Sequence, residues 1–250
     1  MNVKNEMMPP FYSSTLPLSG IKAVLIDIDD TLLSFSGYVK QTMKDGFAQY
    51  DLGKYNDEMY LIFKKINNEL WKQIEQGTLS FNELQRIRFN RIFKELRIDF
   101  DGEVFEKFFR DSLYNSAIVE PGAVELLQYL GEKYILCIAS NGPYEQQINR
   151  LKVGNLYDYF DYFFISEKIG VQKPSMDFFD HCIGCIKEKS NIDILPNEIV
   201  IIGDSISADI IGAKQYGLST CLYSNNKELP EMVAEADYIV ETLAEIKQIL

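Results

Sequence analysis

Residues 26–31, IDIDDT, place three carboxylates within four positions, directly behind the apolar residues 24–26. Like charges crowded at the end of a buried strand repel one another strongly unless a cation lies among them. A continuous rather than alternating apolar run is typical of a strand that is covered on both faces, as in a parallel sheet. The stretch therefore predicts a buried parallel strand whose carboxyl end carries a charged site.

Five further short apolar runs follow along the chain, and helical patterns separate most of them. This alternation predicts an α/β fold with a doubly wound parallel sheet. Gly154 and Gly217 follow two of the helical patterns, where a helix typically ends. The expected strands cover residues 21–26, 134–139, 162–165, 199–202, 219–223 and 238–240.

The chain between the first two expected strands has helical periodicity instead. Apolar residues recur every three or four positions over residues 59–74, 84–96 and 104–109, and Ser80 with Glu83 has the spacing of a capping box. We therefore predict an inserted all-helical unit at residues 34–119. The α/β core would comprise residues 20–33 and 120–250, behind a flexible lead-in at residues 1–19.

Composition excludes several classes of protein. The net charge of −12 argues against a nucleic-acid binder, which needs a basic face to neutralise phosphates. No stretch approaches the roughly 20 apolar residues of a membrane span, and the first 19 residues lack the apolar block of a secretory signal. We therefore expect a cytoplasmic protein without a membrane or nucleic-acid partner.

The cysteines and the single histidine offer one alternative site. His181 precedes Cys182 and Cys185, which form a CxxC that can indicate zinc or redox chemistry. No second CxxC exists and the segment has a helical pattern, so we favour structural thiols over a metal or redox site. A Ser-His-Asp hydrolase would have to use His181, and the chain has no GxSxG elbow.

Polar residues cluster behind four of the expected strands. Ligands of open α/β sheets bind at the carboxyl ends of the strands, so these residues should converge at one edge. Oxygen ligands without His or Cys select a hard ion, and Mg²⁺ is the obvious candidate. The clustered residues are Asp27, Asp29, Asp30, Ser140, Asn141, Lys173, Gly203, Asp204 and Asp209.

These segments resemble, in order, the four motifs of the haloacid dehalogenase superfamily. The motifs are residues 27–31 (DIDDT), Ser140-Asn141, Lys173-Pro174, and Gly203-Asp204 with Asp209. The resemblance runs from about residue 20 to the C-terminus, and the helical insertion lies where that family places its helical cap. It implies a Mg²⁺-dependent phosphomonoester hydrolase that acts on a small phosphorylated metabolite.

The resemblance also implies catalytic roles for two residues. Asp27 would attack phosphorus and form an aspartyl-phosphate, and Asp29 would protonate the leaving oxygen and then activate water. The haloacid dehalogenases themselves lack an acid at the position of Asp29, because a halide leaving group needs no proton. Asp30 departs from the family's more usual Gly, and we expect it to be solvated or locally hydrogen-bonded, without a role.

The remaining motif residues would bind the metal or the phosphoryl group, again by resemblance. Asp29 would contribute its backbone carbonyl to the metal, Asp209 would lie behind the metal ligands, and Asn141 would use its backbone amide. The implied Mg²⁺ residues are Asp27, Asp29, Asp204 and Asp209, and the implied substrate-binding residues are Ser140, Asn141 and Lys173.

Simpler interpretations account for some of these residues. A calcium-binding EF-hand starting at Asp27 is excluded, because its sixth and twelfth positions are Leu32 and Tyr38 rather than Gly and Glu. Asp204 alone could be a helix cap, although this would not explain the other motifs. Four alternatives of the same fold stay open: a sugar-phosphate phosphatase, a phosphomutase or phosphotransferase, a dehalogenase, which the presence of Asp29 disfavours, and a catalytically silent binding module.

A narrower resemblance concerns the substrate. Residues 68–71 (NELW) with 77–80 (GTLS), 120–124 (EPGAV), 165–167 (ISE) and 203–205 (GDS) are similar to the bacterial nucleoside 5′-monophosphatases of the YjjG/YfnB type. This similarity implies a nucleoside monophosphate as substrate. Trp71 lies in the first of these stretches, and a helical Trp is more often a core residue than a ligand contact.

Overall fold

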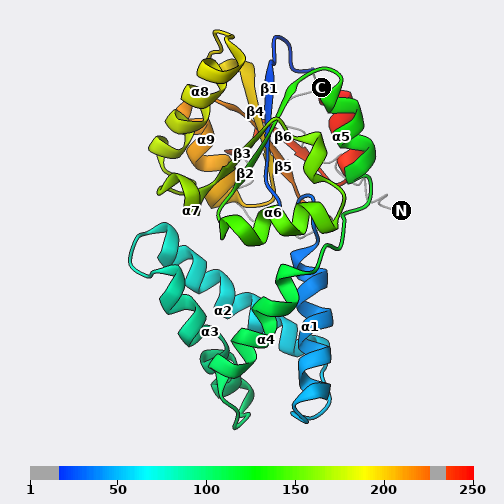
Figure 1. The fold of residues 1–250 in the computed structure, drawn as a ribbon, viewed down its shortest axis with the longest axis vertical. Helices are drawn as coiled ribbons and strands as arrows, with labels where there is room; N and C mark the ends of the chain where they lie inside the picture. The colour runs from blue at the N-terminus through cyan, green and yellow to red at the C-terminus, as the bar shows by residue number, and fades with distance from the viewer. Residues whose placement is uncertain (1–16, 226–234) are drawn as a thin grey trace, which may run out of the picture.

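The computed structural model describes residues 17–225 and 235–250 of the chain. Most of the flexible lead-in expected from the sequence, residues 1–16, lies outside the described residues. The described chain forms a parallel sheet flanked by helices, with a bundle of helices at one end (Figure 1). The fold class predicted from the sequence is therefore confirmed.

The six described strands pair in parallel in the order β3-β2-β1-β4-β5-β6. From β1 the chain runs to β2 and β3 on one side and then crosses back to β4 on the other side of β1, so the strand order reverses beside β1 and the carboxyl end of β1 lies at the switch point where such folds bind their ligands. The strands are β1 (Ala23–Ile26), β2 (Ile135–Ser140), β3 (Tyr162–Ile165), β4 (Ile199–Gly203), β5 (Ser219–Tyr223) and β6 (Tyr238–Val240).

Alternate residues of β1 pack on opposite faces of the sheet, as the two-residue period of a strand requires. Val24 and Ile26 pack under α5 (Ala123–Gly131), whereas Ala23 and Leu25 pack under α8 (Met176–Ser190). Side chains of the flanking helices therefore cover both faces of the strand and exclude water, which explains why the strand sequences are continuously apolar. Figure 1 shows α5 on one side of the sheet and α8 with α9 on the other. The remaining helices of this part are α6 (Tyr144–Val153), α7 (Ser166–Ile169), α9 (Gly212–Tyr216) and α10 (Ile246–Ile249).

The helical bundle consists of the four helices that precede α5 in the described chain. Its aromatic and aliphatic side chains form a core of their own, separate from the two faces of the sheet. The capping box predicted at Ser80 and Glu83 is present at the start of α3. The bundle helices are α1 (Phe35–Gln49), α2 (Asp57–Glu75), α3 (Phe81–Leu96) and α4 (Gly102–Tyr114).

Helix α1 lacks the clear apolar periodicity of the other bundle helices because small residues form part of its buried face. Gly46 lies against the Phe105 ring, and a Cβ at this position would overlap that ring. The bulk that fills this part of the core thus comes from α4 rather than from α1.

Two chain segments connect the bundle to the sheet, and they run side by side. Leu33 and Val119 form an antiparallel bridge. Ser34 N donates to Ile118 O at 2.7 Å, and Glu120 N donates to Leu32 O at 2.9 Å. The bundle is therefore joined to the core through a narrow, hydrogen-bonded pair of segments.

Among the described residues, none of the helices combines the length and apolarity that crossing a bilayer requires.

Candidate active site

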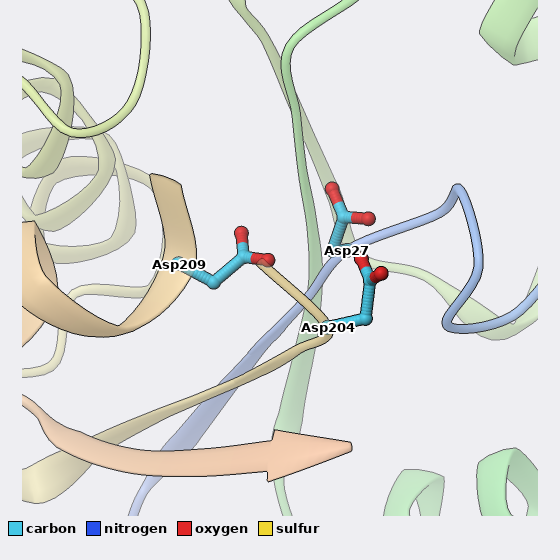
Figure 2. A group of neighbouring side chains, drawn as sticks. All are labelled: Asp27, Asp204 and Asp209. Atoms are coloured by element: carbon cyan, nitrogen blue, oxygen red, sulfur yellow. The ribbon is translucent and has the colours of Figure 1, made fainter. Parts of the chain in front are cut away.

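Three carboxylates from separate parts of the chain meet at the carboxyl edge of the sheet. Asp27 directly follows β1, Asp204 directly follows β4, and Asp209 lies in the π-helical segment Ile206–Ile211. One carboxylate oxygen from each lies within 4.8 Å of the others. Figure 2 shows Asp27 and Asp204 next to each other, with Asp209 reaching toward them from its helix. The predicted convergence of these residues is therefore present in the structure.

The chain around Asp209 is shaped to bring its carboxylate against β4. A Cβ at position 203 would overlap the Asp209 carboxylate, so the last residue of β4 must be Gly. Ser205 N donates to Asp209 Oδ2 at 3.0 Å, and Ser205 Oγ caps the helix by accepting from Ala208 N at 3.2 Å. The π-helical turn thus fixes Asp209 beside the strand end, and such turns are frequent at functional sites.

Lys173 lies at the centre of this cluster with only 1% of its surface exposed. Its ammonium bonds Asp27 Oδ1 at 2.8 Å and Asp209 Oδ1 at 2.6 Å, and it also donates to the Ala139 carbonyl. Burial lowers the pKa of Lys173, but the Asp209 and Asp27 carboxylates outweigh burial, so the pKa is raised overall. Lys173 is therefore a buried cation held in place by three oxygen acceptors.

The donor set of this cluster fits a divalent cation. Burial raises the pKa of Asp27 well above its ordinary value; Lys173 opposes this shift, and the neighbouring carboxylates of Asp209, Asp204 and Asp29 add to it. Lys173 offsets only part of the negative charge of the cluster. Because all three clustered side chains offer oxygen and none offers nitrogen or sulfur, a hard ion such as Mg²⁺ fits them.

A bound cation is expected to stabilise the protein in a pH-dependent way. At a Mg²⁺ concentration of about 100 times Kd, EDTA-treated protein should gain roughly 5–10 °C in Tm. The raised pKa of Asp27 means that a proton competes with the ion, so the gain should shrink as pH falls from 8 toward 5. Thermal unfolding with and without Mg²⁺ at both pH values measures this effect. Asp204→Asn should abolish the gain in Tm. If Mg²⁺ left the Tm of the unmodified protein unchanged at both pH values, the cluster would not be a Mg²⁺ site.

The carboxylate of Asp29 points to a different set of partners from that of Asp27. Arg150 Nη1 donates to Asp29 Oδ1 at 2.6 Å, and Gln147 Nε2 donates to Asp29 Oδ2 at 2.8 Å. Arg150 is 1% exposed and also bonds Gln147 Oε1 and the Ser116 carbonyl. Two residues apart in sequence, Asp27 and Asp29 thus face different cations and are suited to different roles.

Ser140 and Asn141 stand at the end of β2, where the sequence places them. Ser140 Oγ accepts from Gln147 Nε2 at 2.9 Å, and the same amide bonds Asp29, so Ser140 and Asp29 are close neighbours. The Asn141 side chain accepts from Lys173 N at 2.9 Å and donates to Lys173 O at 2.8 Å. Asn141 therefore holds the backbone that carries the buried ammonium.

Asp30 adopts a left-handed conformation with φ of 55°, which explains why Gly suits this position. Asp tolerates this conformation better than most side chains because it bonds locally. Here Oδ1 accepts from Ser36 N at 2.8 Å, as expected for a locally hydrogen-bonded residue.

The sequence analysis missed three polar residues that lie at the site. Gln147 and Arg150 bind Asp29 from α6. Glu75 lies at the end of α2; burial raises its pKa, and a hydrogen bond from Ser207 opposes the shift. The spacing of Gln147 and Arg150, three apart behind Ser140-Asn141, was the available signal, because residues at i and i+3 share a helix face.

A cleft of about 340 Å³ adjoins this cluster, between the bundle and the core. We call it the interface cleft. One wall comes from the end of α2, the start of α3 and the connection between them, and the other from the loop after β2, from α7 and from the segment that follows α7. Its lining residues include Trp71, Ile74, Leu79, Phe81, Asn141, Pro143, Ser166, Val171 and Gln172.

Comparison with known proteins shows similarity along most of the chain. A family model for haloacid dehalogenase-like hydrolases matches residues 21–217. The pyrimidine 5′-nucleotidase PynA of Streptococcus pneumoniae is 33% identical over 213 residues, which are 81% of this chain and 84% of PynA. The pyrimidine 5′-nucleotidase YjjG of Escherichia coli is 29% identical over 228 residues, 91% of this chain and 96% of YjjG.

A solved structure shows the same similarity in three dimensions. The crystal structure of the HAD-hydrolase YfnB from Bacillus subtilis, bound to magnesium, matches with a TM-score of 0.81 and 30% identity. The match covers 92% of this chain and 98% of that one, so it includes both the sheet and the helical bundle.

Proposed function

Because the chain belongs to the haloacid dehalogenase-like hydrolases, we propose that it is a Mg²⁺-dependent phosphomonoester hydrolase that forms an aspartyl-phosphate on Asp27. One observation carries this proposal: Asp27 and Asp29 lie at the same strand end but bond different cations, Lys173 and Arg150. A nucleophile and a separate acid-base are the two groups that a two-step phosphoryl transfer needs.

In the first step Asp27 attacks phosphorus while Asp29 gives a proton to the leaving oxygen. In the second step Asp29 takes a proton from water, and this water hydrolyses the aspartyl-phosphate. Lys173 sits against Asp27 and stabilises negative charge that develops on the phosphoryl oxygens. Asp27, Asp204 and the backbone carbonyl of Asp29 would hold Mg²⁺, with Asp209 next to these ligands, and the ion would supply further positive charge at the phosphoryl group.

We propose that Ser140 and the backbone amide of Asn141 bind the remaining phosphoryl oxygens. Both residues follow β2, beside the β1 end that carries Asp27. Gln147 already donates to Ser140 Oγ, which leaves the hydroxyl proton of Ser140 available to donate to an anion.

We propose that residues 34–119 act as a cap on a core formed by residues 20–33 and 120–250. The hinges would lie near residues 33–37 and 117–121, where the paired connecting segments cross between the two parts. Closure would exclude bulk water and complete the site around the substrate.

A nucleoside 5′-monophosphate is the proposed substrate. YjjG and PynA, named as pyrimidine 5′-nucleotidases, support this narrower proposal. The cytoplasmic location expected from the sequence stays a prediction.

A substrate panel in labelled water tests the function. Purified, Mg²⁺-loaded protein should release phosphate from nucleoside monophosphates, with one labelled oxygen in the product. Preferential release from sugar phosphates would indicate a sugar-phosphate phosphatase instead. Transfer of the phosphoryl group to a sugar without label would indicate a phosphomutase, and no turnover on any ester would indicate a silent binding module.

Arg150→Met should lower kcat about tenfold to a hundredfold with a nucleoside monophosphate, because Asp29 would lose the partner that orients it. With p-nitrophenyl phosphate the loss should be much smaller, since its leaving group departs without a proton. The measurement is kcat for both esters. An equal loss on both would show that Arg150 supports the fold rather than the orientation of Asp29.

A further inference from the structure

We propose that the interface cleft binds the leaving group of the substrate as a neutral, planar ring system, a nucleobase, packed against Trp71. The proposal rests on the phosphatase function proposed above, and it assigns the specificity site. Four properties of the cleft carry it: its position, its aromatic wall, its lack of cations and its uncommitted polar atoms.

The cleft opens beside the residues proposed to bind phosphate. Asn141 lines the cleft, and its side chain brackets the Lys173 backbone. Gln172, the residue before Lys173, also lines the cleft. A phosphate held near Lys173 therefore places the organic part of the ester at the mouth of the cleft.

The bundle wall of the cleft is aromatic. The Trp71 and Phe81 rings pack together with centroids 5.8 Å apart, and both side chains are only partly buried. Both residues line the interface cleft of about 340 Å³, so the ring pair is accessible to a ligand there. Every nucleobase has a flat face that stacks on such a wall.

The charge of the lining argues against an anionic leaving group. Within the described part of the chain, the residues that line the cleft include no Lys or Arg, and Glu167 is the one acidic residue among them. A second phosphate or a carboxylate on the substrate would find no counter-charge there and would meet Glu167. The lining thus favours a nucleoside over a bisphosphate or a sugar acid.

Two polar groups in the cleft remain available to orient a ring. Among the described residues, the Ser166 hydroxyl and the Gln172 amide oxygen have no hydrogen-bond partner. Other polar groups are already engaged: Ser80 bonds Glu83, and Glu167 Oε2 accepts from Tyr144 N at 2.7 Å. A mostly apolar cleft with a few placed polar atoms is typical of a small-molecule site.

A hydrogen bond between the two walls holds the cleft in its present form. Gln172 Nε2 donates to the carbonyl of Ile74, at the end of α2, at 2.7 Å. The cleft consequently exists only when the bundle sits against the core in this way, and a ligand in it would contact both parts.

Intrinsic fluorescence tests binding directly, because Trp71 is the single tryptophan of the protein. In the Asp27→Asn variant, uridine and uridine monophosphate should change the Trp emission in a saturable way, while ribose 5-phosphate should not. This readout requires no turnover. If the Trp emission did not change at a high concentration of uridine, the proposal would be overturned, even if the protein is a phosphatase.

Kinetics test the role of the ring. Trp71→Ala should lower kcat/KM for uridine monophosphate relative to ribose 5-phosphate about tenfold, and Trp71→Phe should restore most of that ratio. Phe100→Ala is the matched control, because Phe100 is also a partly buried aromatic residue of the bundle. It lies in the α3–α4 connection, which is away from the sheet (Figure 1). The Phe100→Ala variant should leave the ratio of the two kcat/KM values unchanged.

The two proposals fail in distinguishable ways. If the wild-type protein hydrolyses no phosphate ester, the phosphatase proposal fails. The fluorescence titration still shows whether the cleft binds a nucleoside. If the protein hydrolyses esters but Trp71→Ala lowers kcat/KM equally for uridine monophosphate and ribose 5-phosphate, only the cleft proposal fails. Repeating the ratio with adenosine monophosphate shows whether ring size matters.

Discussion

Asp27→Asn should lower kcat by a factor on the order of 10⁴ or more, because an amide cannot serve as the nucleophile that accepts the phosphoryl group. The change is nearly isosteric, and the amide oxygen can still accept from Lys173, so the fold should survive. Substrate binding should persist, since the phosphoryl contacts proposed for Ser140, Asn141 and Lys173 remain. Steady-state kinetics and acid-quenched phosphorylation of the peptide containing residue 27 measure the two effects.

Asp30→Asn is the matched control for this experiment. It lies in the same loop, and Asn tolerates the left-handed conformation and can still accept from Ser36 N. Activity close to wild type is expected. Wild-type turnover by Asp27→Asn, or label on another residue, would show that Asp27 is not the nucleophile.

Lys173→Met should cost about 3–5 kcal/mol of stability in Mg²⁺-free protein, because it leaves the buried Asp27 and Asp209 carboxylates without their shared cation. The methionine preserves most of the side-chain volume, so the loss would report charge rather than a cavity. Urea unfolding with EDTA measures it, and added Mg²⁺ should recover part of it. Activity should fall as well, since the transition state loses a positive charge.

The stability loss in Lys173→Met should depend on pH with a defined sign. The pKa of Asp27 is already raised by burial, and Lys173 is the group that opposes the rise. Without Lys173 the pKa rises further, and a folded-state pKa above the unfolded value means stability that is present in acid and lost as pH rises through the folded value. The deficit should therefore be smallest below the ordinary pKa of an Asp side chain and should grow toward neutral pH. An equal deficit at pH 4 and pH 8 would contradict this account.

The candidate site was predictable where a residue follows a strand. Asp27, Ser140 and Asp204 stand at strand ends, so the position of each strand located the residue. Lys173 follows β3 and α7 at some distance, and only the order of the motifs singled it out. The geometry of a parallel sheet brings strand ends together whatever the surrounding loops do.

Residues on helices were not predictable in the same way. Gln147 and Arg150 look like solvent-facing polar residues of an amphipathic helix, and only the packing of α6 beside the end of β1 buries them against Asp29. Glu75 reaches Ser207 because the bundle folds back over the core. The three-residue spacing of Gln147 and Arg150 indicates a shared helix face, but a single sequence does not show which element that face contacts.

The sequence by itself determined the fold class, because continuous apolar strands and periodic helices are local patterns that report which faces are buried. It also determined which functional groups, namely carboxylates, a hydroxyl, an amide and an ammonium, are available at the carboxyl edge of the sheet. The tertiary structure decided how those groups are divided: Lys173 is shared by Asp27 and Asp209, Asp29 is turned to Arg150, and an aromatic cleft is left open next to them. The physical reason is that pairing among buried charges depends on distances of a few ångströms between elements far apart in the chain, and these distances exist only after the elements pack.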